Sequence, residues 1–180
     1  MKDIQIALIR GINVGKAKRL PMAGLRELCV NLGFKNVKTL LNSGNIVFTV
    51  TRVAPAKSAL MIEDGIFDSY GISARVIVLT ADELTEIVDE NPLLKIMLDP
   101  SRLLVTVLEK ASDARSLKKL EKQTKKPEAL AVGKRAVYQW CPDGILKSGC
   151  AQAVAHELGD TATARNWATI TKLYSMLSES

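Results

Sequence analysis

A loop that carries glycine, basic and amide side chains follows the first apolar segment of the chain. It begins Arg10-Gly11-Ile12-Asn13-Val14-Gly15 and continues through Lys16, Lys18 and Arg19 to Pro21. Glycine lets a backbone turn sharply and approach a ligand closely, and arginine and lysine add positive charge and directed donors. Pro21 is typical of the first position of a helix, and a helix N-terminus attracts anions. These residue types predict a site for a phosphate-bearing ligand.

A second polar turn, Asn42-Ser43-Gly44-Asn45, lies between residues 37–41 and 46–50, two segments rich in residues that favour strands. This order predicts a β-hairpin, and Ser43 and Asn45 could supply hydrogen bonds to the same ligand. In the alternative interpretation both loops only make tight turns, Arg10 pairs with a carboxylate and the lysines are solvated. The candidate ligand-binding residues from the two loops are Arg10, Gly11, Asn13, Gly15, Lys16, Ser43, Gly44 and Asn45.

Arg165 and Asn166 form a third candidate cluster, directly before Trp167. Trp167 could stack on a base while Arg165 contacts its phosphate, as in proteins that bind single strands. Asn166 is also a good N-cap, and the apolar residues that follow recur at helical spacing, which favours core packing for Trp167. The residues of that stripe are Trp167, Ile170, Leu173, Tyr174 and Leu177.

Groups for metal binding or catalysis are few. Cys29, Cys141 and Cys150 show no CxxC spacing and His156 is the single histidine, so we expect no disulfide framework, no metal site and no cofactor. Buried, reduced thiols are favoured over a catalytic cysteine, because a nucleophilic thiol needs a base or a positive neighbourhood. The first loop matches neither GxxxxGK[ST] nor GxGxxG. No catalytic residue can be named, so whether the chain is an enzyme stays open.

The elements that must position these loops alternate along the chain in a regular order. Apolar patterning, glycines and prolines predict strand, helix, two strands joined by a turn, helix and strand in each half. In the first half the strands are 3–9, 37–41, 46–50 and 74–79, and the helices are 21–32 and 55–70. In the second half the strands are 103–108, 129–132, 136–140 and 161–164, and the helices are 113–124 and 148–158.

This order predicts an α+β fold with two ferredoxin-like (βαββαβ) subdomains. The expected boundaries are 1–80 for the first subdomain, 81–102 for a linker helix and loop, 103–164 for the second subdomain and 165–180 for a C-terminal helix. The linker helix begins with a capping box, Thr80-Ala81-Asp82-Glu83. In such a unit the third strand lies between the first two, so the exit of the first strand and the turn at 42–45 share an edge.

Three motifs in order resemble one family of bacterial proteins, the domain-of-unknown-function 1697 family. They are the segment 10–15, the turn 42–45, and Ala164-Arg165-Asn166-Trp167 followed by Thr169 and Lys172-Leu173. The resemblance extends from Ile6 to about Leu177, and it implies an α+β structure with two ferredoxin-like subdomains and no established activity. Lys16 and Asn42 depart from the glycine and glutamine that are usual in the family at these places.

Positive charge is concentrated in the second half of the chain. The whole sequence of 180 residues has a net charge of +6, and residues 110–135 contain nine Lys and Arg but three Asp and Glu. Such a stretch attracts polyanions, but lysines at helical spacing opposite Leu117 and Leu120 are also typical of a solvated helix face. No apolar run approaches the ~20 residues of a membrane helix, and no secretory signal is evident. We therefore expect a cytoplasmic protein with no membrane partner.

Our leading functional hypothesis is an anion-binding module for a nucleotide or nucleic acid at the 10–19 loop and the 42–45 turn. One alternative is a metal-free enzyme that acts on a small phosphorylated metabolite with the same polar groups. Another is an assembly module whose glycine-bearing edge contacts a protein or a second copy of the chain. The sequence does not decide the oligomeric state.

Overall fold

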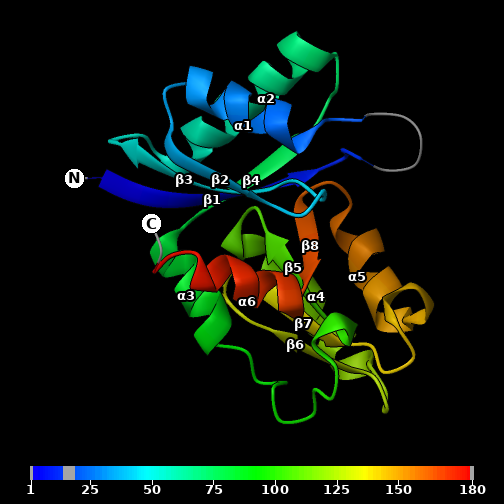
Figure 1. The fold of residues 1–180 in the computed structure, drawn as a ribbon. Helices are drawn as coiled ribbons and strands as arrows, with labels where there is room; N and C mark the ends of the chain where they lie inside the picture. Colours follow the sequence, from blue (N-terminus) through cyan, green and yellow to red (C-terminus); the bar gives the residue numbers. More distant parts are fainter. Residues whose placement is uncertain (1, 14–18, 179–180) are drawn as a thin grey trace. The chain divides into compact units, whose positions relative to one another are not determined.

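The computed structural model describes residues 2–13 and 19–178 of the chain. The chain forms two compact units, one of residues 1–84 together with 173–180 and the other of residues 85–172. Figure 1 shows the elements of each unit. No helix in the described ranges is both long enough and apolar enough to span a lipid bilayer.

The first unit is a four-stranded antiparallel sheet with two helices on one face (Figure 1). The strand order is β2-β3-β1-β4, so β3 lies between β1 and β2 as the predicted topology requires. The elements are β1 (Lys2–Arg10), α1 (Met22–Asn31), β2 (Lys35–Leu40), β3 (Asn45–Thr51), α2 (Pro55–Tyr70) and β4 (Arg75–Thr80).

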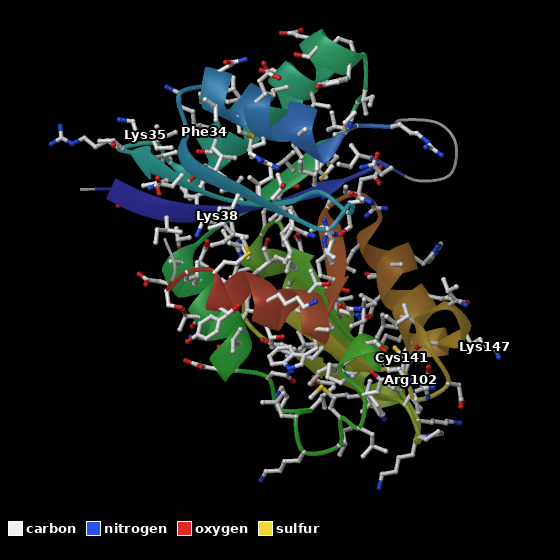
Figure 2. All side chains as sticks on the ribbon, in the orientation of Figure 1. Phe34, Lys35, Lys38, Arg102, Cys141 and Lys147 are labelled. Atoms are coloured by element: carbon white, nitrogen blue, oxygen red, sulfur yellow. The ribbon has the colours of Figure 1, made fainter. Side chains whose placement is uncertain are left out.

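The core of the first unit fills the space between this sheet and its helices. Ala7 and Ile9 of β1 face it, together with Leu25 of α1 and Ile62 of α2. Phe34, which directly precedes β2 and is labelled in Figure 2, stacks on Phe48 with ring centroids 4.5 Å apart. The alternation of side chains along β1 therefore decides which face the helices cover.

Helix α3 (Ala81–Asp89) begins with the predicted capping box. The Glu83 amide donates to the Thr80 hydroxyl at 3.1 Å, and the Thr80 amide donates to a Glu83 carboxylate oxygen at 3.0 Å. Two amides that a helix start would leave without acceptors are thus satisfied reciprocally.

The second unit repeats the topology of the first, with a four-stranded antiparallel sheet of order β6-β7-β5-β8. Its strands are β5 (Leu103–Leu108), β6 (Ala129–Val132), β7 (Ala136–Trp140) and β8 (Ala162–Asn166). Its helices are α4 (Ala114–Gln123) and α5 (Gly149–Leu158), with short turns η1 (Pro100–Arg102), η2 (Ala111–Asp113) and η3 (Ile145–Lys147). Helix α6 (Trp167–Ser175) follows β8 directly. The predicted α+β fold with two ferredoxin-like subdomains is confirmed.

Two local predictions are wrong. Pro21 is the N-cap of α1 in extended conformation, with ψ 136°, and not its first helical residue. Tyr174 and Leu177 do not join the buried stripe of α6, because 38% of Tyr174 is exposed and Leu177 is half-buried beyond the helix end at Ser175. Trp167, Ile170 and Leu173 are buried as predicted. Helical spacing predicts the direction of a side chain around the helix axis. It does not predict how much of that helix face the rest of the protein covers.

Candidate functional site

The two polar loops of the first unit meet at one end of its sheet. Leu8 pairs with Asn45 in the antiparallel β1–β3 ladder, so the exit of β1 lies beside the β2–β3 turn. The Ile9 amide donates to the Gly44 carbonyl at 2.8 Å. The predicted juxtaposition of these loops is confirmed.

Asn13 ties the loops together with its side chain. Its Oδ1 accepts from the Leu20 amide at 2.8 Å, and its Nδ2 donates to the Leu20 carbonyl at 3.0 Å and to the Asn42 carbonyl at 2.8 Å. The residue adopts a left-handed conformation, with φ 55°, which asparagine tolerates better than most residues. Asn13 thus joins the two ends of the loop to each other and to the facing turn.

Gly44 allows the turn to pack closely on the exit of β1. A Cβ at this position would lie 2.7 Å from Ile12 Cδ1 and 2.9 Å from Ile9 Cβ. Its φ of 75° also falls in the region that favours glycine. Both the backbone conformation and the available space therefore require glycine here.

A hollow of about 370 Å³ opens where the loop meets α1. Among the described residues that line it, no side chain is acidic, and the exposed Arg19 supplies a positive charge. Pro21, the N-cap of α1, offers no side-chain acceptor, and the first turn of the helix contains no acidic residue. The lining residues are Asn13, Arg19, Leu20, Pro21, Met22 and Asn42. The hollow therefore combines a positive charge with the amide donors of a helix N-terminus.

The predicted residues of the two loops fall into different positions. Asn13 lines the hollow, whereas Asn45 is fully buried and donates to the Leu40 carbonyl at 2.8 Å and to Ser43 Oγ at 2.9 Å. Arg10 is exposed and does not line the hollow, because Ile9 faces the helices and strand alternation directs Arg10 to the other face of the sheet.

The remaining loop glycine that the structure describes, Gly11, turns the chain at the end of β1 with φ 84°. Gly15 and Lys16 lie outside the described residues. Met22 and Leu20 were not predicted as lining residues, since an apolar residue beside a helix start carries no sequence signal for a site.

Arg165 and Asn166 lie in the second unit, at the junction of β8 and α6. Asn166 Oδ1 accepts from the Thr169 amide at 3.0 Å and from its hydroxyl at 2.8 Å, so it caps α6 as predicted. The guanidinium of Arg165 donates to Thr163 Oγ1 at 3.0 Å and to the Ala164 carbonyl at 2.8 Å. Burial lowers the pKa of Arg165 to about 10, so it is still charged at neutral pH. Buried Trp167 does not present a face to a base.

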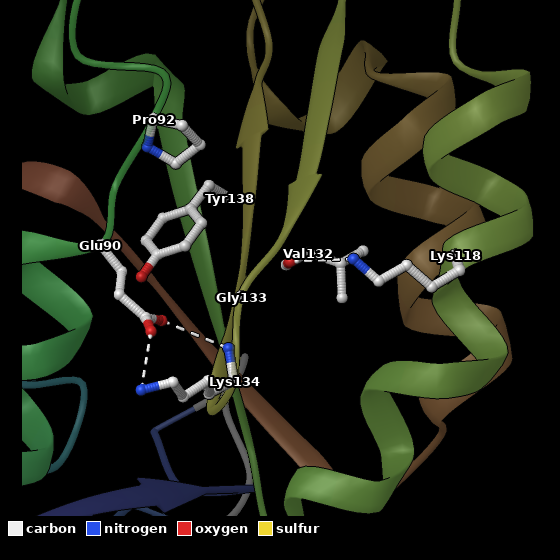
Figure 3. A pocket seen from close by; sticks show the side chains of 7 residues that line it. All are labelled: Glu90, Pro92, Lys118, Val132, Gly133, Lys134 and Tyr138. Carbon is white, nitrogen blue, oxygen red and sulfur yellow. Dashed lines mark hydrogen bonds and ion pairs between the residues drawn. The ribbon is translucent and has the colours of Figure 1, made fainter.

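The second unit has its own hollow, of about 440 Å³, beside the β6–β7 hairpin (Figure 3). Lys134 forms ion pairs there with Glu86 and Glu90, and the hydrogen bond with Glu86 is the main cause that raises the pKa of Lys134. Tyr138 donates to the Ile87 carbonyl at 2.7 Å, and burial raises its pKa. The charges of this hollow are thus largely balanced by one another. No motif in the sequence pointed to it, because its residues come from three separate segments.

The three cysteines are buried free thiols, as predicted. Burial raises the pKa of Cys29 to about 12. Cys141, labelled beside Arg102 in Figure 2, donates through its amide to the Arg102 carbonyl at 3.0 Å. A hydrogen bond from Cys150 lowers the pKa of Cys141, and the same contact raises that of Cys150. In the described part of the chain, no three His, Cys, Asp or Glu side chains are placed to hold a metal ion.

Comparison with known proteins agrees with this architecture. The conserved bacterial protein SP0830 from Streptococcus pneumoniae has a similar structure, with a TM-score of 0.78 and 24% sequence identity over 98% of this chain and 99% of that chain. At this identity the likeness shows the fold alone. No curated protein matches the sequence significantly. A family described as "Protein of unknown function (DUF1697)" matches residues 2–138, which include the first two motifs but not the third. The chain therefore belongs to the DUF1697 family.

Proposed function

We propose that the first unit binds the phosphate group of a small ligand, such as a nucleotide, in the hollow between the 10–20 loop and the β2–β3 turn. The observation that carries this proposal is the hollow itself, which joins Arg19 to an α1 N-terminus without a side-chain cap. Its volume of about 370 Å³ is in the range of small-molecule sites.

Several hydrogen-bond donors lie at or next to the hollow. The amides of Met22, Ala23 and Gly24 belong to the first turn of α1, where a helix has no intrahelical acceptors for them. A phosphate there would accept from these amides, and Arg19 could add two parallel hydrogen bonds to its oxygens. The side-chain amide of Asn42 forms no hydrogen bond with another described residue, so it can donate as well.

Backbone strain beside the hollow also supports a ligand site. Leu41, directly before Asn42, has φ 58° and thus a left-handed backbone conformation. A left-handed conformation costs an ordinary residue about 1–2 kcal/mol. Such strained residues cluster at ligand sites, where the surrounding structure holds them in place.

Titration of the full chain with inorganic phosphate and with nucleoside mono-, di- and triphosphates tests this function. Isothermal calorimetry would give the affinity, and amide NMR shifts would locate the ligand at Ala23 and Gly24. Arg19→Ala should weaken binding at least tenfold, because hydrogen bonds to a charged group contribute about 1.5–3 kcal/mol.

Arg26→Ala is the matched control. Arg26 is exposed on α1 and does not line the hollow, so this change removes the same charge from the same unit. Equal weakening in both variants would mean that only net charge matters. Absence of binding by every phosphate compound, with an intact fold, would overturn the proposal.

A further inference from the structure

A strongly basic surface lies on α4 and on the residues that follow it, in the second unit. We call Arg115, Lys119, Lys122, Lys125 and Lys126 the α4 basic surface; all five are exposed. This surface shares no residue with the hollow of the proposed function.

The first three of these cations lie together on one side of the helix. At 3.6 residues per turn, Arg115, Lys119 and Lys122 fall within about 60° of one another around the α4 axis and opposite Leu117. Leu117 is fully buried in the core of the second unit. The cations are therefore directed away from the protein, along about 10 Å of helix.

None of the five cations has an acidic partner in the described ranges. The acidic residues of the same stretch bond to groups other than these five cations. Glu121 accepts from the Val132 amide at 3.1 Å and pairs with Lys118, and Glu128 accepts from the Cys150 amide at 3.2 Å. Asp113 accepts from the Ser112 hydroxyl at 3.4 Å. The charge of the α4 basic surface is therefore not compensated by its sequence neighbours.

Lys118 and Lys134 are lysines of the same unit whose side chains have structural contacts. Figure 3 shows Lys118 directed from α4 to Val132, whose carbonyl accepts a hydrogen bond from Lys118 Nζ at 3.3 Å, and Lys134 paired with Glu90. These two lysines join elements to each other. The five cations of the α4 basic surface make no such contact.

Like charges three and four residues apart destabilise a helix by about 0.2–0.5 kcal/mol per pair. A surface that serves solubility alone mixes both signs and avoids this cost. We propose that the α4 basic surface binds the phosphodiester backbone of a nucleic-acid duplex. The release of counterions from the duplex would drive this binding.

The surroundings of α4 favour a duplex over other polyanions. Single-strand binding relies on exposed aromatic rings, but Tyr138, Trp140 and Trp167, the aromatic residues of this unit, are buried. Insertion into a lipid surface needs a free apolar helix face, and the apolar face of α4 is packed on the core through Leu117. If the α4 basic surface contacts only phosphates, its binding should not depend on the base sequence of the duplex.

Fluorescence anisotropy of the full chain with labelled 20-base-pair DNA and RNA duplexes, from 50 to 200 mM NaCl, tests the proposal. Five phosphate contacts predict a slope of log K against log salt of about −4.5 for DNA. Lys119→Gln/Lys122→Gln removes two contacts and should reduce the slope to about −2.7. Lys119→Arg/Lys122→Arg keeps the charges and should bind like the unchanged protein.

Lys35→Gln/Lys57→Gln is the charge-matched control, because both lysines are exposed in the first unit. Its slope should stay near that of the unchanged protein. An equal loss in this control, or no duplex binding at 50 mM NaCl, would overturn the proposal. Binding to a single strand or to phosphatidylserine vesicles that is tighter than binding to a duplex would also overturn it, since it would assign the surface to another partner.

Discussion

Two residues decide whether the two loops of the first unit can meet. Asn13 satisfies three polar groups with one side chain, and Gly44 leaves room that a Cβ would fill at 2.7 Å from Ile12. Arg19, in contrast, contributes charge to the hollow and has no such contact with another described residue. At the residue scale, Asn13 and Gly44 shape the proposed site, whereas Arg19 would contact the ligand.

Cys29 predicts a pH dependence of stability. Its pKa is raised by burial from 9.0 to about 12 in the folded chain. Its thiol therefore destabilises the folded state only above pH 9, where the unfolded chain releases the proton and the folded chain does not. Between pH 8 and 10 the unchanged protein should lose about 1.4 kcal/mol more unfolding free energy than Cys29→Ala.

Urea unfolding of both proteins at pH 8 and pH 10 measures this difference. The comparison removes the constant effect of the missing sulfur, because only the change with pH is used. Equal losses in the two proteins would show that Cys29 ionises in the folded state as easily as in the unfolded state.

Helix starts differ in how their first backbone amides are satisfied. Helix α3 is closed by the reciprocal bonds of Thr80 and Glu83, whereas α1 begins at Pro21 without a side-chain cap. The first arrangement satisfies its own amides, and the second leaves amides for an external acceptor. At the element scale, α1 shares a start without a side-chain cap with α2 and α4, and the start of α1 borders the proposed site.

The capping box gives a prediction for α3. Thr80→Ala should destabilise the helix start by about 1 kcal/mol, because the Glu83 amide loses its acceptor. Thr80→Ser keeps a hydroxyl and should recover most of this loss. Chemical denaturation of Thr80→Ala, Glu83→Ala and the double variant would also show whether the two bonds are coupled. Full stability of Thr80→Ala would mean that the box seen in the structure contributes little.

At the scale of the whole molecule, the two units repeat one topology. Each unit has its own four-stranded sheet, and the cores contain different residues, such as Ile62 of α2 and Leu117 of α4. The first unit carries the proposed small-ligand hollow, and the second carries the α4 basic surface. The repeat concerns backbone topology, and the functional surfaces differ between the units.

Because each unit has its own core, we expect a cavity-forming substitution in one core to affect mainly the sheet of that unit. Ile62→Ala and Leu117→Ala should each cost about 2–5 kcal/mol, because both side chains are fully buried. Hydrogen exchange should increase mainly in β1 and β3 for the first variant, and mainly in β5 and β7 for the second. Equal loss of protection in both sheets for both variants would show one cooperative core instead.

Much of the fold was predictable because its signals are local. Helix 55–70 and strands 103–108, 129–132 and 136–140 were predicted with the bounds that the structure has. Glycine, proline and apolar periodicity act within a few residues, so they mark such elements directly. How much of a helix face is buried depends on residues distant in the sequence. The exposure of Tyr174 could therefore not be predicted from its spacing.

The sequence by itself determined the order of elements, the two ferredoxin-like subdomains and the meeting of the exit of β1 with the 42–45 turn, because strand pairing follows from topology. Only the tertiary structure decided which side chains share a space. It placed Arg19 and Asn42 at the hollow, directed Arg10 to the other face of the sheet, and paired Glu121 and Glu128 away from the α4 cations. Side-chain direction and partner choice depend on neighbours distant in sequence, which local patterns do not record.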